Sequence, residues 1–221
     1  MKFNVTTRLT AVAAGLLLAS SAAQAVTDLT LSGPYAKGDP GSVQQTDDNP
    51  CIYGGSDCGS NQPADWPGYK DMPTGSGGTD VVTNYGSYEY TVGYLLGLFG
   101  GKTQFGIGID TNSTGNSTET LDLFQVLFDD VVAYEYDGGA DLIPSNNGTG
   151  WTDYILSSFS IAGLDPASVV TFNLTMSGMG DGADSFYFIT GEEREVPEPA
   201  SLALLGLRLA GLGLARRRKT H

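Results

Sequence analysis

The sequence contains almost no histidine, since His221 at the C-terminal end is the only one. Ser-His-Asp and Cys-His nucleophilic sites, and zinc or iron sites with imidazole ligands, all need this side chain. Carboxylate catalysis of the glycoside hydrolase kind needs only two Asp or Glu side chains at a suitable distance, which sequence alone does not show. We therefore expect no enzymatic activity, with a carboxylate-based glycoside hydrolase as the alternative.

Positive charge is also scarce. The chain has 11 Lys and Arg against 25 Asp and Glu, a formal net charge of −14. Residues 26–195 hold only four of the basic residues and 24 of the acidic ones, which leaves this body at −20. Such a surface repels nucleic acid, so we expect no nucleic-acid partner. It attracts divalent cations, although solubility alone also explains this composition.

The N-terminal residues have the three parts of a secretory signal. Lys2 and Arg8 give a positive start, residues 9–19 are apolar, and Ala23-Gln24-Ala25 fits a cleavage site. We therefore expect residues 1–25 to form a signal helix that the Sec machinery recognises and that is removed on export. A short buried N-terminal helix is the alternative.

The C-terminal residues form a second three-part element. Val196-Pro197-Glu198-Pro199 is followed by an apolar run at 200–215 and then by the basic cluster of Arg216, Arg217 and Arg218. A structure-breaking proline pair, an apolar segment and a terminal basic cluster predict a stop-transfer transmembrane helix with its cationic end in the cytoplasm.

This element, residues 196–221, resembles the PEP-CTERM sorting signal of Gram-negative bacteria. The resemblance implies that Pro197, Glu198 and Pro199 are recognition residues for exosortase, a membrane protease. It also implies export to the cell surface or extracellular matrix, in association with exopolysaccharide, from a precursor anchored in the inner membrane. Arg208 departs from the pattern, because a charge at the bilayer centre costs about 3 kcal/mol. We therefore expect only weak, transient anchoring through this helix.

Cysteine is rare, and the only two, Cys51 and Cys58, lie within residues 33–79. This segment is rich in glycine and proline, and turn pairs such as Asp39-Pro40 predict little regular structure in it. Two cysteines this close in an exported chain favour a local disulfide that staples the segment. Closing so short a loop contributes about 2.5 kcal/mol on the chain-entropy model. Two free thiols or a metal site are the alternatives.

The remaining sequence favours β-structure, with 31 glycines and 11 tyrosines and a period-two alternation of apolar residues. Tyr88, Tyr90, Val92 and Tyr94 show this alternation. The strands that we expect lie at 27–31, 88–94, 105–109, 121–128, 131–136, 170–176 and 185–190, with another within 154–161. Asp129-Asp130 predicts a hairpin turn. The pattern predicts an all-β fold for 26–195, an antiparallel, jelly-roll-like β-sandwich of half-buried strands.

Several loops carry oxygen side chains close to glycines, as calcium binding requires. The loop at 110–116 and the turn at 179–184 are two of them, although ordinary turn chemistry explains both. No bidentate Glu occupies the last position of an EF-hand loop, where Leu121 stands. The weak calcium candidates are Asp110, Asn112, Asp181 and Asp184, and no other cofactor is expected.

The sequence therefore predicts a non-enzymatic, exported surface or matrix protein with a structural or interaction role. The nearest alternative is a carbohydrate-binding module, with or without a stabilising calcium ion. Trp151 and Tyr154, beside the polar loop at 146–150, could form part of a sugar platform. Trp66 and Tyr53 could stack on sugars too, although a place in the core is the more common fate of such aromatic residues.

Overall fold

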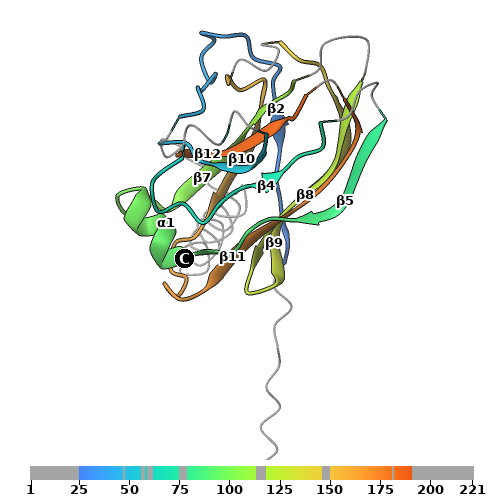
Figure 1. Ribbon diagram of the computed structural model, residues 1–221. Coiled ribbons are helices and arrows are strands. Elements are labelled where there is room, and N and C mark those ends of the chain that lie inside the picture. The colour runs from blue at the N-terminus through green and yellow to red at the C-terminus, as the bar shows by residue number, and fades with distance from the viewer. Residues whose placement is uncertain are drawn as a thin grey trace, which may run out of the picture.

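The computed structural model describes residues 25–46, 48–55, 58, 62–74, 79–112, 118–145, 150–180 and 182–190. These residues form two packed β-sheets with one short helix to the side (Figure 1). The expected signal helix, apart from Ala25, and the expected C-terminal transmembrane helix lie outside the described residues. Within the described ranges no helix is long and apolar enough to cross a membrane.

The first sheet has the order β1-β9-β8-β11-β5, with β6 also paired to β11, and the second has the order β2-β10-β7-β12-β3-β4. The strands of the first sheet are β1 (Thr27–Asp28), β5 (Asp80–Gly86), β6 (Tyr90–Thr91), β8 (Glu119–Phe128), β9 (Val131–Leu142) and β11 (Val169–Met179). Those of the second are β2 (Leu31–Ser32), β3 (Cys51–Gly54), β4 (Lys70–Asp71), β7 (Gln104–Asp110), β10 (Tyr154–Ser160) and β12 (Ser185–Thr190).

The long strands pair in a nested way. The β8–β9 hairpin is innermost, and outward from it β7 pairs with β10, β5 with β11, and β3 with β12, all antiparallel. The hairpin turn is the expected one: Asp129 and Asp130 have φ values of 49° and 65°. Positive φ at both central residues matches the right-handed twist of the flanking strands.

The expectation of a wholly antiparallel sandwich is wrong at two edges. β1 runs parallel to β9, and β4 runs parallel to β3. A parallel neighbour needs a long connection rather than a tight turn. Both edge strands are two residues long, and β4 reaches β3 through the residues after the second cysteine. The single strand expected at 27–31 is in fact two short strands, one in each sheet.

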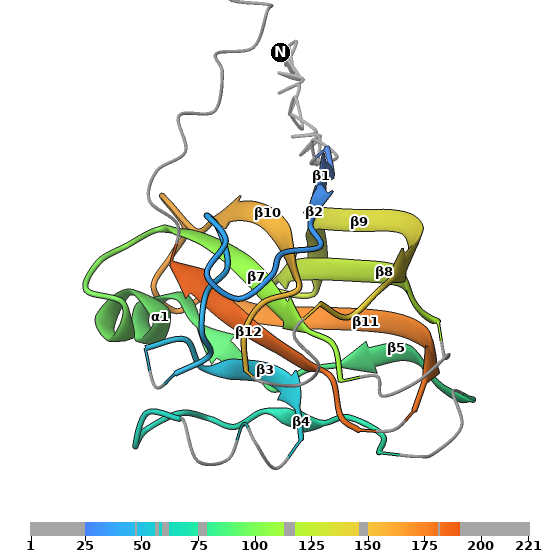
Figure 2. The same ribbon diagram turned by 90° about the horizontal axis from the view of Figure 1, so that it is seen from above.

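Figure 2 shows the ribbon of the two sheets from above. Aromatic and aliphatic side chains fill the space between the sheets. The strand expected at 170–176 is confirmed within β11, and its alternate residues Val170, Phe172, Leu174 and Met176 are all buried. Phe172 meets Phe188 of the second sheet with ring centroids 5.4 Å apart. Burial of each such side chain contributes about 1.5–3 kcal/mol, so this layer supplies the main stabilisation of the sandwich.

The prediction of a strand at 88–94 is mostly wrong. Only Tyr90–Thr91 is a strand, and the helix α1 (Val92–Leu98) follows at once. The Thr91 hydroxyl accepts a hydrogen bond from the Tyr94 amide at 3.2 Å and so caps the helix. Val92 and Leu95, three residues apart, face the core from the same side of the helix. The cap and this spacing outweigh the period-two alternation.

Candidate functional site

Four carboxylates are buried at the end of the sandwich where β7 ends and where β8, β10 and β12 begin. Each of these side chains is at most 5% exposed; they are Asp110, Glu119, Asp153 and Asp184. Asp110 ends β7, and its registry partner Ser185 opens β12 directly after Asp184. Burial of an ionised carboxylate is costly unless hydrogen bonds or a cation compensate it, so the surroundings of each group show what it can do.

Asp153 is fully compensated by hydrogen bonds. Its Oδ2 accepts from the Thr111 amide and the Thr111 hydroxyl, both at 2.9 Å, and its Oδ1 accepts from the Ser145 amide at 2.7 Å. Its own amide donates to the Ile109 carbonyl. Asp153 therefore ties the loops after β7 and β9 to the start of β10. No sequence motif marked this residue.

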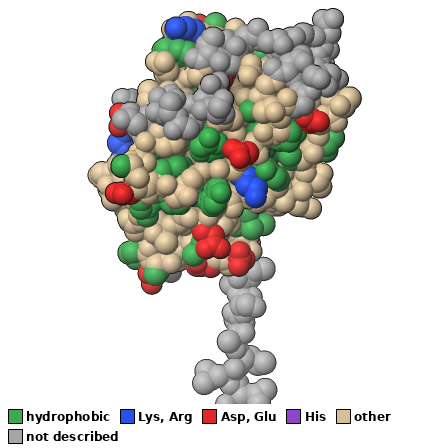
Figure 3. Space-filling model, viewed as in Figure 1, with side chains coloured by type: hydrophobic (Ala, Val, Ile, Leu, Met, Phe, Trp, Pro, Cys, Tyr) green, Lys and Arg blue, Asp and Glu red, His purple; other side chains and the backbone are tan. Residues whose placement is uncertain are grey.

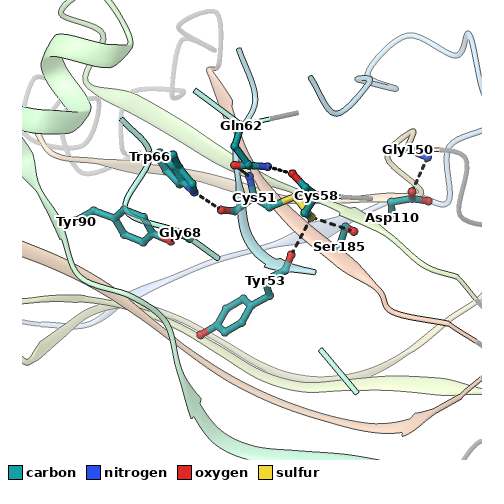
Figure 4. The surroundings of a disulfide bond; sticks show 10 residues. All are labelled: Cys51, Tyr53, Cys58, Gln62, Trp66, Gly68, Tyr90, Asp110, Gly150 and Ser185. Carbon is teal, nitrogen blue, oxygen red and sulfur yellow. Dashed lines mark hydrogen bonds between the residues drawn. A yellow bond between two sulfur atoms is a disulfide. The ribbon is translucent and has the colours of Figure 1, made fainter. Parts of the chain in front are cut away.

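Asp110 lies on the disulfide side of the second sheet (Figure 4). Its Oδ2 accepts a hydrogen bond from the Gly150 amide at 2.7 Å. The hydroxyl of its registry partner, Ser185, lies 3.5 Å from Cys58 Sγ. On the same side, burial raises the pKa of Tyr187 well above its ordinary value, and the charges of Asp110 and Asp153 raise it further.

Asp184 lies between the two sheets. Its Oδ1 accepts a hydrogen bond from the Asn112 amide at 2.9 Å, and it meets the Glu119 side chain of the first sheet. Burial raises the pKa of Asp184 to about 6, and the charge of Asp153 raises it too, whereas the hydrogen bonds with Asn112 and Glu119 oppose the shift. A carboxyl group that meets another carboxyl in a buried position needs a proton or a cation between the two.

The structure brings three of the calcium candidates, Asp110, Asn112 and Asp184, to one end of the sandwich. It also separates them, because Asp110 faces the disulfide and Asp184 faces Glu119. Asp181 lies outside the described residues. Across the described part of the chain, no group of three or more His, Cys, Asp and Glu side chains is spaced to hold a metal ion. Glu119, which the sequence pattern missed, is the carboxylate that Asp184 meets.

The predicted disulfide between Cys51 and Cys58 is present, with a Cα–Cα distance of 5.9 Å. The Gln62 side chain forms hydrogen bonds with the main chain of both cysteines. Its Oε1 accepts from the Cys51 amide at 3.0 Å, and its Nε2 donates to the Cys58 carbonyl at 2.6 Å. The Trp66 indole donates to the Cys51 carbonyl at 2.9 Å (Figure 4). These contacts hold an otherwise irregular segment against β12.

The aromatic residues considered for a sugar platform are largely used inside the protein. Trp66 stacks on Tyr90 with ring centroids 4.7 Å apart, and Tyr53 is fully buried. Tyr154 is 6% exposed, and its hydroxyl bonds the main chain of Ile143, so it cannot form an open platform with Trp151. The Lys37 ammonium lies over the Trp151 ring, 5.2 Å from the ring centroid.

Comparison with known proteins identifies one region of the chain. Residues 195–219 match the PEP-CTERM protein-sorting motif. The predicted recognition residues Pro197, Glu198 and Pro199 and the arginines at 216–218 all fall in this range, which lies outside the described residues. No curated protein and no solved structure matches the chain.

Proposed function

We propose that this protein is a non-enzymatic component of the cell surface or matrix. The proposal starts from the PEP-CTERM motif, which indicates an exported protein that exosortase sorts. Its sandwich would have a structural or interaction role in association with exopolysaccharide. The sorting motif at 195–219 is the observation that carries the proposal. In this reading, residues 1–25 are a Sec signal, and the apolar run at 200–215 anchors the precursor transiently in the inner membrane.

Residues 26–195 have features that are typical of proteins outside the cytoplasm. A buried disulfide between Cys51 and Cys58 is typical of an oxidising compartment. The face in Figure 3 carries scattered acidic side chains and few basic ones, which favours solubility and resists non-specific association. The nested strand pairing supports a jelly-roll sandwich, a fold with rigid sheets and loops gathered at its ends.

The positions of the buried carboxylates support a non-enzymatic role. Asp153 and Asp184 are at most 1% exposed, and Asp153 holds loops through three hydrogen bonds. A glycoside hydrolase needs two carboxyl groups that reach a substrate on either side of the scissile bond. Groups with so little access to solvent serve structure better than hydrolysis.

The sorting part of the proposal is tested by intact mass of the protein from envelope fractions and culture medium, in cells with and without exosortase. We expect loss of residues 1–25, loss of the tail only when exosortase is present, and a mass consistent with one disulfide. Glu198→Gln should leave the tail uncut, whereas Glu193→Gln, just before the matched range, should be processed normally. Full-length protein in the cytosol with both thiols reduced would contradict the proposal.

The exopolysaccharide part has its own test. The processed protein is mixed with exopolysaccharide purified from the producing cells, and the bound fraction is measured after sedimentation. Binding above that of an unrelated protein with a similar net charge supports an interaction role with the polysaccharide. An equal bound fraction for the two proteins would remove exopolysaccharide as a direct partner.

A further inference from the structure

Four polar side chains form a row across the first sheet. Gln125 of β8 is the registry partner of Glu135 of β9 on one side and of Asn173 of β11 on the other. Gln125 Nε2 donates to Glu135 Oε2 at 2.5 Å, and Asn173 Nδ2 donates to Gln125 Oε1 at 3.0 Å. In the edge strand β5, Asn84 Oδ1 lies 3.5 Å from the same Asn173 nitrogen. We call Glu135, Gln125, Asn173 and Asn84 the polar row.

The polar row lies on the outer face of this sheet, turned away from the second sheet. Successive side chains of a strand point to opposite faces, and the direct neighbours of Gln125 and Asn173 point into the core. These buried neighbours are Phe124, Val126, Phe172 and Leu174. Figure 2 shows β9, β8, β11 and β5 side by side, and the spacing of strands makes the row about 14 Å long.

The side chains of the polar row are held in place by one another. Asn84 has a φ of 49°, a conformation in which Asn is enriched, and its amide donates to the Thr175 hydroxyl at 3.2 Å. A carboxamide has two donor hydrogens and an oxygen with two lone pairs. Within the described residues, the row therefore leaves the Asn173 oxygen and one hydrogen of Gln125 Nε2 available to a ligand. Side chains already fixed lose little entropy on binding.

Charge restricts the class of ligand that this face can bind. None of the six strands of the first sheet contains Lys or Arg, whereas Asp122, Asp137 and Asp141 are acidic. Such a face repels a polyanion and gives it no ion pair. Uncharged hydroxyl groups meet no such repulsion, and each of them both donates and accepts, as the carboxamides of the row require.

Apolar side chains flank the row on the same face. Leu123 and Leu127 lie two residues before and after Gln125 on β8 and are half-buried. Their registry partners on β11 are Thr175 and Thr171, also half-buried. The face therefore offers apolar contact for the C–H groups of a sugar ring beside hydrogen-bonding groups for its hydroxyls.

We propose that the outer face of the first sheet binds an uncharged polysaccharide, whose chain lies along the polar row across β9, β8, β11 and β5. This inference rests on the proposed role with exopolysaccharide, and it adds the chemical class of the polymer and the face that holds it. Hydroxyl groups of the polymer bond to Asn173, Gln125 and Asn84, and its sugar rings contact Leu123 and Leu127.

The test uses the processed protein and exopolysaccharide from the producing cells, separated by anion exchange into an uncharged and an acidic fraction. Sedimentation of the protein over a range of concentrations of each fraction gives the Kd. The uncharged fraction should bind the protein, and the acidic fraction should not. The Kd for the uncharged fraction should be equal in NaCl of about 0.05 M and about 0.5 M, because salt weakens contacts between charges only.

Two variants locate the site, and a third is the matched control. Asn173→Ala removes the central amide and should raise the Kd about three- to tenfold, the effect of one or two hydrogen bonds. Asn84→Gly should raise it about two- to fivefold, and it should fold even if Asn173→Ala does not, because glycine adopts a positive φ without strain. Gln104→Ala removes a half-buried amide from β7 in the second sheet and should leave the Kd unchanged. Urea unfolding checks that each variant is folded.

The outcomes separate this inference from the proposed function. An unchanged Kd for the uncharged fraction in both Asn173→Ala and Asn84→Gly would overturn the polar row as the site and leave a role with exopolysaccharide intact. Failure of both fractions to bind would overturn this inference together with the exopolysaccharide part of the proposed function. Stronger binding of the acidic fraction, binding that high salt abolishes, or an exopolysaccharide with no uncharged fraction would overturn the assignment to an uncharged polymer.

Discussion

Gly108 in the centre of β7 gives the most direct test of how the irregular segment packs on the second sheet. A Cβ at this position would lie 2.6 Å from Thr152 Cγ2, 2.8 Å from Tyr187 Cε2 and 2.9 Å from Ile189 Cδ1. These distances are shorter than real carbon contacts. Gly86 in β5 is the matched control, because a Cβ there meets nothing within 4 Å. Neither glycine has a positive φ that would itself penalise alanine.

The neighbours of Gly108 cannot move aside easily. The Tyr187 hydroxyl donates to the Val43 carbonyl at 3.0 Å, and the Thr152 hydroxyl accepts from the Val43 amide at 2.8 Å. Val43 of the covering segment thus fixes two of the three side chains that the new methyl group would meet. Overpacking of a tight core costs about 1–3 kcal/mol. Gly86→Ala should instead be neutral or stabilise the strand by up to about 1 kcal/mol.

The two variants are compared by urea unfolding of the oxidised protein, followed by tryptophan fluorescence. With an m value of about 2 kcal/mol/M, Gly108→Ala should lower the urea midpoint by about 0.5–1.5 M relative to the unsubstituted protein. Gly86→Ala should leave the midpoint unchanged or raise it. Equal midpoints for the two variants would refute the packing of the segment on β7, and with it the burial of both faces of this sheet.

Three further predictions concern the disulfide, the buried carboxylate and the tail. Replacing Cys51 and Cys58 together with alanine should lower the free energy of unfolding by about 2.5 kcal/mol in urea, and a loss below about 0.5 kcal/mol would count against the staple. The free energy of unfolding should fall as pH rises from about 4 through about 6 and then level off, because burial holds the folded-state pKa of Asp184 above its ordinary value of 3.8; Asp184→Asn should flatten the profile. Arg208→Gly should increase the membrane-retained precursor in fractionated cells, because it removes a charge from the apolar run, and an unchanged distribution would argue against a weak anchor.

Alternation in the sequence predicted most of the long strands, because one side of each strand faces a common core. β8, β10, β11 and β12 occupy the expected positions, and the hairpin turn lies at Asp129-Asp130 as expected. The pattern failed where local capping decided the structure. Thr91 ends a strand and caps a helix, and an alternating tyrosine pattern carries no information about that change.

The second failure was the expectation of half-buried strands in the second sheet. β7 has Phe105, Ile107 and Ile109 toward the core, yet the glycines between them are buried as well. The reason is tertiary: Tyr187 and Ile189 of the neighbouring strand, with the two cysteines, form a second apolar cluster that the irregular segment covers. Small residues at 106 and 108 were a signal of this close cover, which a simple alternation of apolar and polar positions does not reveal.

The buried carboxylates at the loop end show why local motifs do not locate a site of this kind. Asp110, Asn112 and Asp184 stand in turn-like sequence, whereas Asp153 bonds Thr111 across 42 residues and Glu119 meets Asp184 only because β8 and β12 begin at the same end. Two aspartates of equal burial then differ in one respect. Asp153 receives three hydrogen bonds, whereas Asp184 receives the Asn112 amide on one oxygen and its side chain meets that of Glu119. The two groups therefore differ in how their negative charge is compensated, and the acidic composition alone does not show that difference.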